Sequence, residues 1–215
     1  MYRRLLNMKI FIFVICFLLI FSYPMKANTD NNDTIKVKAG YLKNQDNTVL
    51  FKNGVDIMKG NIKLFSKEGT MKRENKNLIL KNNVKMLFKK GEIRSNRVKA
   101  LMNKNKYIFK DNVIFDYTSN KNNNDFLLKA PILEVLTKDN SFIAKNGVEI
   151  DYKEKKIKSI KAEYKSSKDQ LILEDNVHIK EKNGEWIKSK KAVIYLNEKD
   201  SFTAEGEVNL NLTIN

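Results

Sequence analysis

The sequence predicts an all-β protein built from six copies of a two-strand repeat of roughly 30 residues. Three observations lead to this prediction. A ten-residue block recurs along the chain, apolar and polar residues alternate within each copy, and helical signals are nearly absent from Asn28 onward. Stacked copies of such a unit bury a continuous apolar face that one copy cannot bury alone.

The recurring block has the pattern x-Φ-x-Φ-K-N-G/N-V-x-Φ, where Φ is apolar. Its copies occupy residues 48–57, 77–86, 106–115, 141–150, 170–179 and 201–210, with the shared valine at 55, 84, 113, 148, 177 and 208. A second element of the type I-K-S-x-x-A-x-x-Y precedes each block, in its loosest form near Ile62. A polar insertion at 119–125 explains the one long step between copies.

Each half of the repeat alternates with a period of two, as Leu78, Leu80, Val84 and Met86 show. Alternation of this kind is typical of half-buried strands. We interpret the Asn-Gly or Asn-Asn pair before each valine as a kink in a continuous strand, because Leu80 and Val84 then lie on the same face of the sheet. A two-residue hairpin would set Leu80 opposite a lysine, whereas a three-residue turn also satisfies the alternation. Kinks at the same place in every repeat predict a V-shaped or rolled sheet.

The start of the chain has the features of an export signal. Arg3, Arg4 and Lys9 precede an uncharged apolar run at 10–21, and a small residue, Ala27, follows. We expect residues 1–27 to be a signal peptide or a retained membrane anchor, residues 28–34 a linker, and residues 35–215 the β domain. Cys16 lies inside the run, so the chain from Asn28 onward has no cysteine for disulfides or zinc–thiolate sites.

The composition argues against several function classes. The chain has a net charge of +16, mostly from lysine, which indicates a solvated surface or attraction to anionic ligands. The chain's one histidine, His178, has no cysteine to act with after Asn28, so the sequence suggests no nucleophile–base pair and no enzyme. No metal-ligand spacing or phosphate loop suggests a cofactor. Most aromatic residues share the apolar face rather than the lysine face, which argues against nucleic-acid binding.

The repeat resembles the periplasmic lipopolysaccharide-transport proteins of the LptA/OstA and LptC type. The resemblance rests on the pattern Ile-Lys-Ser…Ala…Tyr followed by Phe-x-Ala-x-Gly-x-Val-x-Leu, and it covers residues 35 to 214. It implies an elongated antiparallel β-jellyroll, slotted along one side, located in the periplasm. It also implies lipopolysaccharide as ligand, with acyl chains sheltered in an apolar groove. The implied partners are inner-membrane LptC-like and outer-membrane LptD-like proteins, with head-to-tail copies of this chain also possible.

Within that resemblance, the inward positions of the repeat are the candidates for a lipid-lining face. They are Phe51, Ile57, Leu80, Met86, Phe109, Phe115, Phe142, Ile150, Leu173 and Ile179. Basic residues flanking the kinks are candidates for contact with anionic head groups. They are Lys52, Lys81, Arg94, Arg97, Lys110 and Lys145.

The two ends of a rolled sheet expose unpaired strands, which invite pairing with another chain. The candidates are residues 35–42 and 208–214, of which the second alternates apolar with uncharged polar residues and has no lysine. The leading interpretation is a bridge between the two membranes, with a membrane-anchored LptC-like component as the alternative. A structural or adhesive β-repeat protein of the envelope is the alternative from another class.

Overall fold

The computed structural model describes residues 34–118, 125–196 and 201–213. Residues from Ile35 onward cluster as one compact unit, separate from Met1–Thr34. The expected signal segment 1–27, all but Thr34 of the linker and most of the polar insertion at 119–125 lie outside the described residues. The division into signal, linker and β domain therefore stays a prediction.

The described residues form one antiparallel sheet, as the repeat predicted. The sheet has 14 strands where six two-strand repeats predict twelve, because the copy near Ile62 is divided into β3 and β4 and the last block into β13 and β14. The strands are β1 Ile35–Gln45, β2 Thr48–Lys59, β3 Ile62–Ser66, β4 Glu68–Lys72, β5 Asn77–Phe88, β6 Gly91–Leu101, β7 Lys106–Tyr117, β8 Phe126–Leu136, β9 Ser141–Tyr152, β10 Lys155–Lys165, β11 Gln170–Glu181, β12 Trp186–Tyr195, β13 Phe202–Glu205 and β14 Asn209–Asn211. A short 3-10 helix, η1 (Met102–Lys104), lies between β6 and β7, and no α-helix occurs in the described part.

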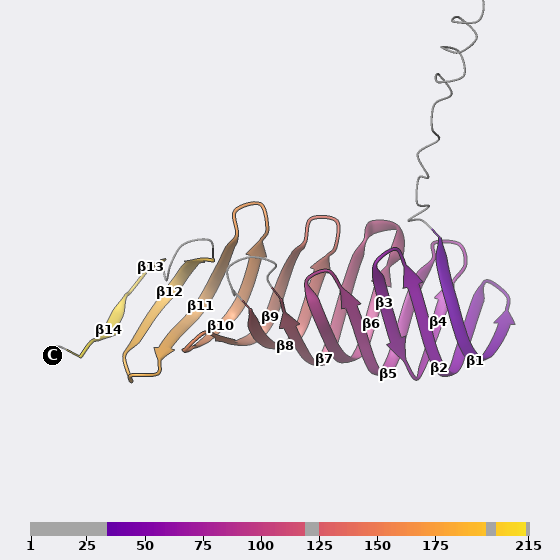
Figure 1. Cartoon of the computed structure of the whole chain (residues 1–215), viewed down its shortest axis with the longest axis horizontal. Coiled ribbons are helices and arrows are strands. Elements are labelled where there is room, and N and C mark those ends of the chain that lie inside the picture. Colours follow the sequence, from indigo (N-terminus) through magenta and orange to yellow (C-terminus); the bar gives the residue numbers. More distant parts are fainter. Residues whose placement is uncertain (1–33, 119–124, 197–200, 214–215) are drawn as a thin grey trace, which may run out of the picture. The chain divides into compact units, whose positions relative to one another are not determined.

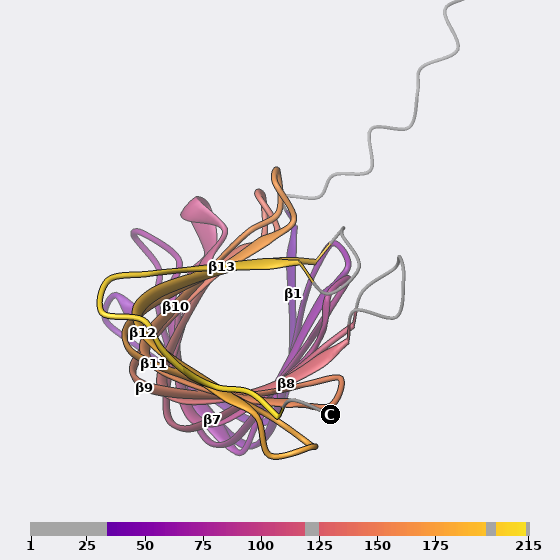
Figure 2. The ribbon, with the colours of Figure 1, turned by 90° about the vertical axis from the view of Figure 1, so that its left-hand side faces the viewer.

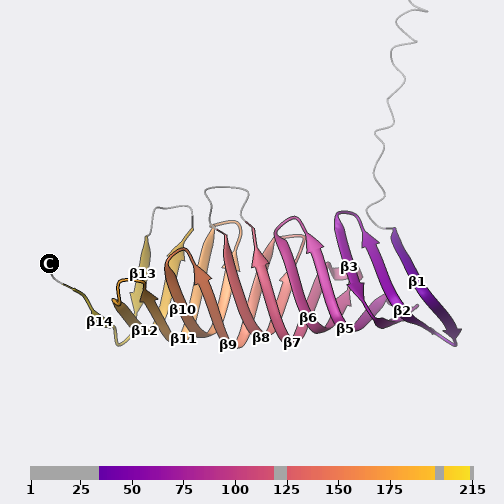
Figure 3. The same ribbon diagram turned by 60° about the horizontal axis from the view of Figure 1, so that its bottom comes forward.

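The strands follow one another in the sheet in nearly the same order as in the sequence, from β1 at one end to β13 and β14 at the other. Figures 1 and 3 show them side by side, running obliquely across the sheet. Figure 2 looks along the row of strands and shows each one curving around a common interior. The unit is thus a rolled antiparallel sheet in which local hairpins supply most of the pairing.

The strands curve because the second strand of each of the first five repeats bends at its Asn-containing pair. β5 runs without interruption through Asn82 and Asn83, whose φ angles are 63° and 56°. β9 bends in the same way at Asn146 and Gly147, with φ of 70° and 96°. Asn and Gly tolerate this left-handed conformation best, which is why they recur there. The predicted kink in a continuous strand is confirmed in the first five copies, which form β2, β5, β7, β9 and β11. It is wrong for the sixth copy, where β13 ends at Glu205 and β14 begins at Asn209.

At each kink, the neighbouring strand has one residue fewer than the kinked strand between the same two cross-strand pairs. Lys81 pairs with Arg97 and Val84 pairs with Ser95, so Asn82 and Asn83 together oppose a single residue of β6. This is a β-bulge, which bends the strand and increases its twist. The repetition of the bulge in successive pairs converts a flat sheet into a roll.

A serine stabilises the opposite side of four of the corners. The Ser95 hydroxyl donates to the Arg97 carbonyl at 3.1 Å, and the same bond to the carbonyl two residues on is made by Ser66, Ser159 and Ser189. These serines are buried, so the hydroxyl and the carbonyl that the bulge releases satisfy each other. In β8 the corner is instead formed by Ala130 and Pro131, where the bulge requires no N–H from the proline.

Candidate functional site

The inner face of the roll is covered by continuous rows of apolar side chains in cross-strand register. One row, ladder A, runs through twelve strands. Its members are Val37, Ile57, Leu64, Met86, Ile93, Phe115, Leu128, Ile150, Ile157, Ile179, Ile187 and Leu210. Ladder B lies across the corner on the other wall. Its members are Leu42, Phe51, Gly69, Leu80, Val98, Phe109, Leu133, Ala144, Ala162, Leu173, Ala192 and Ala204.

The ten residues predicted to line the interior all belong to this inner face. Five are in ladder A and four in ladder B, and Phe142 lies in a third row nearer the β8–β9 turn. None is more than 2% exposed, and all belong to one hydrophobic cluster. The structure therefore brings them together, with the interior filled by their own side chains. Whether they contact lipid stays a prediction.

The rolled sheet has two edges formed by its turns, and the turns alternate between them along the chain. Contacts across the gap between these edges join the two walls. Lys59, at the end of β2, donates to the carbonyl of Met102 at 2.6 Å and to Asn105 Oδ1 at 2.9 Å on the opposite edge. This contact, the Lys59 clasp, closes the gap near η1.

A second bridge lies farther along the roll, in a cluster of aromatic rings. Tyr117 stacks on Phe126 with ring centroids 4.4 Å apart, and Phe115 meets Phe142 of the other wall edge-on at 5.4 Å. The Tyr117 hydroxyl donates to the Tyr164 hydroxyl at 3.0 Å. These contacts, the aromatic bridge, hold the two walls together in the middle of the unit.

The aromatic bridge ends in a buried chain of hydroxyl groups. Tyr164 donates in turn to Asp169 Oδ1 at 2.8 Å. Burial first, and then its bonds with Tyr117 and Asp169, raise the pKa of Tyr164, so its hydroxyl stays protonated. Sequence reasoning did not assign Tyr117 or Tyr164 to the site, although both occupy inward positions of the alternating pattern.

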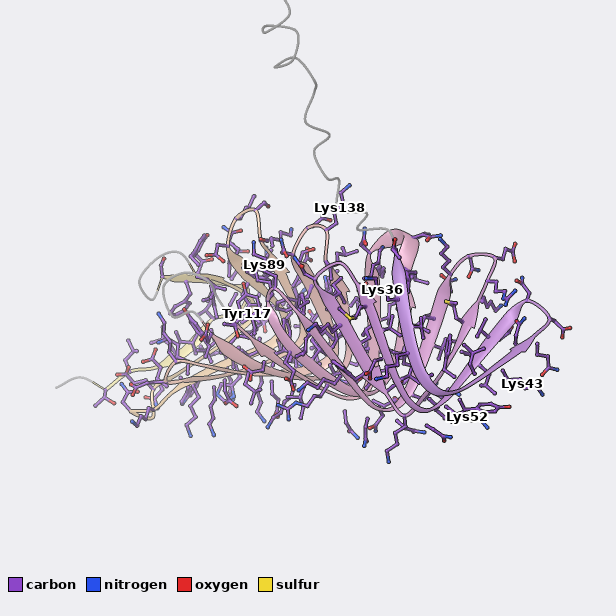
Figure 4. All side chains as sticks on the ribbon, turned by 45° about the vertical axis from the view of Figure 1, so that its right-hand side comes forward. Lys36, Lys43, Lys52, Lys89, Tyr117 and Lys138 are labelled. Atoms are coloured by element: carbon purple, nitrogen blue, oxygen red, sulfur yellow. The ribbon has the colours of Figure 1, made fainter. Side chains whose placement is uncertain are left out.

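The six basic residues predicted to contact head groups lie on the outer face around the corners. Three of them, Lys81, Arg97 and Lys110, are direct cross-strand neighbours on β5, β6 and β7, so their like charges lie side by side. Three have acidic partners, which are Glu92 for Arg94 at 2.9 Å, Asp111 for Arg97 at 3.4 Å and Glu134 for Lys145 at 2.7 Å. Figure 4 shows Lys52 at the β1–β2 end of the unit. Their role toward an anionic ligand stays a prediction.

The outer face also holds its polar residues in cross-strand pairs. Glu134 accepts from Lys106 and Lys145, and hydrogen bonds from these two ammonium groups hold its pKa below the ordinary range. His178 packs edge-on against Trp186 with centroids 6.1 Å apart, and partial burial followed by the charge of Lys188 lowers its pKa. This half-buried packing gives His178 a structural role on the outer face.

A groove of about 920 Å³ lies at the corners of β7 to β11. Its apolar lining includes Ile114, Pro131 and Ile160, and none of the ten predicted lining residues reaches it. The groove is therefore a feature of the corners, and no residue of ladders A and B lines it.

Within the described ranges, no group of three or more His, Cys, Asp or Glu side chains is arranged to hold a metal ion. No helix in that part of the chain combines the length and hydrophobicity that a membrane span requires.

Comparisons with known proteins give one family match over part of the chain and a match to a solved structure. Residues 117–211 match the family described as lipopolysaccharide-assembly, LptC-related. No curated protein matches the sequence significantly. Among solved structures, the chain is similar to LptH from Pseudomonas aeruginosa, described as the LptA-homologous periplasmic component of the lipopolysaccharide transport device, with 12% identity over 84% of this chain and 96% of that chain and a TM-score of 0.26. The match over residues 117–211 supports the resemblance that the repeat predicted, to the LptA/LptC β-jellyroll family of lipopolysaccharide transport.

Proposed function

We propose that this chain binds lipopolysaccharide in the periplasm, shields its acyl chains between the walls of the roll, and bridges the inner and outer membranes by end-to-end strand pairing. The observation that carries the proposal is the continuity of ladders A and B. Each runs through twelve strands, from β1 to the last strands of the sheet, without a charged inward residue. An apolar path of this length suits an alkyl chain that moves along it.

The repeat addresses a problem that any lipid conduit faces. Burial of an alkyl chain contributes about 0.8 kcal/mol per methylene, so a chain of about a dozen carbons gains roughly 10 kcal/mol. Such a chain stays in place unless the next position binds it equally well. Similar residues recur at each step of ladder A, such as Ile150, Ile157 and Ile179, which makes neighbouring positions nearly equivalent.

Entry of an acyl chain requires the two walls to separate, because the interior side chains already pack against one another. The Lys59 clasp and the aromatic bridge are the contacts that hold the walls across the gap. We therefore place the entrance along this gap, with acyl chains inside and head groups outside among the lysines of the turns.

The ends of the roll support the bridging part of the proposal. Leu42 of β1 is 59% exposed and Leu210 of β14 is 56% exposed, although both belong to the inner ladders. A second sheet edge paired with β1 or with β13 and β14 would cover these residues and continue the apolar path.

A reversible staple across the gap tests lipid entry. In a chain with Cys16→Ser, the pair Lys59→Cys and Asn105→Cys is joined by a cross-linker that contains a disulfide. We expect the stapled protein to keep its β-sheet circular dichroism spectrum and to lose uptake of purified lipopolysaccharide, with uptake restored by reductant.

The matched control joins Asn105→Cys to Thr137→Cys. Thr137 donates to the Asn105 carbonyl from the same edge of the gap, so this staple leaves the gap free. Equal uptake with both staples would contradict entry along the gap. A folded wild-type chain that binds no lipopolysaccharide at all would instead favour the adhesive envelope protein.

A membrane-anchored LptC-like component is the second candidate, and the LptC-related match over residues 117–211 favours it specifically. The two candidates differ in the fate of residues 1–27. N-terminal sequencing of the protein from cells distinguishes them, since a start near Asn28 indicates the free bridge and an intact N-terminus in the membrane fraction indicates the anchored form.

A further inference from the structure

One polar group in the interior has no partner within the described part of the chain. The hydroxyl of Tyr107 is buried and makes no hydrogen bond there, and the residue as a whole is 0% exposed. A buried hydroxyl without a partner destabilises a protein, because it loses its bonds to water and gains none in exchange. By contrast, the buried hydroxyls of Tyr117 and Tyr164 bond to each other.

The repeat itself provides the comparison that makes this hydroxyl unusual. Tyr107 is the second residue of its ten-residue block. The same position in the other five copies holds Val49, Leu78, Phe142, Leu171 and Phe202, which are all apolar. An apolar side chain therefore suits this position of the fold, and packing requires the ring of Tyr107 but not its hydroxyl.

The surroundings of Tyr107 place it near the gap between the edges. It is the second residue of β7 and lies three residues after the end of η1. Its cross-strand neighbours on the inner face are Ala100 and Val135. Lys59 reaches across the gap to Met102 and Asn105, in the segment that leads into β7. An acyl chain that entered the gap at this point would pass Lys59 and the segment that leads into β7 before it reached Tyr107.

We propose that the Tyr107 hydroxyl binds an oxygen atom at the head end of an acyl chain held in the roll, either the carbonyl oxygen or a hydroxyl on the first carbons. The inference rests on the proposed function and adds a specific polar contact to it. The chemical class of ligand is an acyl lipid with such an oxygen, and a pure hydrocarbon does not satisfy the site. Burial raises the pKa of Tyr107 to about 12, so the group is a hydrogen-bond donor throughout the physiological range.

Tyr107→Phe tests the proposal, because it removes the hydroxyl and keeps the ring. The probes are tetradecanoic acid and 3-hydroxytetradecanoic acid, with affinities measured by isothermal titration calorimetry on the full chain. We expect the variant to bind one or both acids about 10-fold more weakly, the usual effect of one hydrogen bond in a dry site. Weakening of both acids assigns the contact to the carboxyl oxygen, and weakening of the hydroxy acid alone assigns it to the hydroxyl.

The melting temperature separates a ligand contact from a structural one. Tyr107→Phe is expected to melt at the wild-type temperature or above it, since an unpaired hydroxyl contributes nothing to the free protein. Tyr164→Phe is the matched control and is expected to melt at a lower temperature, because its hydroxyl has two partners.

Two results would overturn the inference alone. One is unchanged affinity of Tyr107→Phe for both acids, and the other is a clear fall in its melting temperature. If the wild-type chain binds neither acid nor lipopolysaccharide, the proposed function fails and this contact fails with it.

Discussion

The middle and the ends of the roll are built from the same repeat, but equivalent positions of the repeat are buried in the middle and exposed at the ends. Phe115 and Leu210 occupy the same ladder, yet Phe115 is 1% exposed and Leu210 is 56% exposed. In ladder B, Phe109 is 0% exposed and Leu42 is 59% exposed. The difference arises from the number of neighbouring strands, because a terminal strand has a partner on one side only. The middle thus contains most of the buried core, and the ends leave apolar surface exposed.

The strongest test of this comparison removes one large side chain from each region. Phe115→Ala in the aromatic bridge is expected to lower the free energy of unfolding by about 3–5 kcal/mol, through lost burial and the cavity left behind. Leu210→Ala at the end is expected to change it by less than about 0.5 kcal/mol. Urea titration followed by circular dichroism measures both. A similar loss at the two sites would show that the end is as well packed as the middle.

The next effect concerns the hydroxyl chain of the bridge. Tyr164→Phe removes the acceptor of Tyr117 and the donor to Asp169, and leaves the Tyr117 hydroxyl in an apolar interior. We expect a loss of about 2 kcal/mol in the free energy of unfolding. Tyr41→Phe is the control, since Tyr41 at the β1 end is 45% exposed. Wild-type stability of Tyr164→Phe would contradict a bridging role for this group.

A smaller effect is expected from the outer face of the middle region. Glu134→Gln weakens the bonds from Lys106 and Lys145 and should lower the free energy of unfolding by about 1 kcal/mol at pH 7. The native pKa of Glu134 lies below its ordinary value of 4.5, so this stabilisation is complete above pH 4.5 and is lost as the pH falls through the native pKa.

The difference between wild type and Glu134→Gln should therefore shrink when urea titrations are repeated at progressively lower pH below 4.5. Glu149→Gln is the control, because its ion pair with Lys158 is exposed and should leave stability unchanged. A difference that persists unchanged at low pH would show that the effect does not come from the carboxylate.

The smallest effect on stability is expected at the ends, where the effect on assembly should be large. Leu42→Glu and Leu210→Glu place a charge on exposed apolar surface and should change the free energy of unfolding by less than about 0.5 kcal/mol. Both should abolish end-to-end self-association in sedimentation velocity, because a carboxylate cannot be buried against another sheet. Unchanged association would contradict pairing through β1 and β14.

Much of the fold was predictable because its contacts are local in sequence. The strands, the kink at Asn82 and Asn83 and the burial of all ten predicted lining residues follow from period-two alternation. Val208 shows where the pattern misleads, since it matches the buried valine of every other copy but is 45% exposed. Among the described strands, none covers it, and the repeat pattern alone does not reveal that this copy lacks a neighbour.

The site was less predictable because its decisive contacts join residues far apart in sequence. Lys59 and Asn105 are 46 residues apart and Tyr117 and Tyr164 are 47 apart, and no periodicity connects them. These two contacts form only because each bulge bends the sheet by a certain angle and the tilted strands place one edge of the roll opposite the other.

The sequence by itself determined that this protein is a rolled antiparallel sheet with an apolar inner face, since alternation and a recurrent Asn-rich kink act between neighbouring residues. Only the tertiary structure decided that the interior is filled by its own side chains, that two bridges close the gap, and that the Tyr107 hydroxyl is left without a partner there. These features depend on distances between the two walls, and such distances arise only once every corner has bent the sheet.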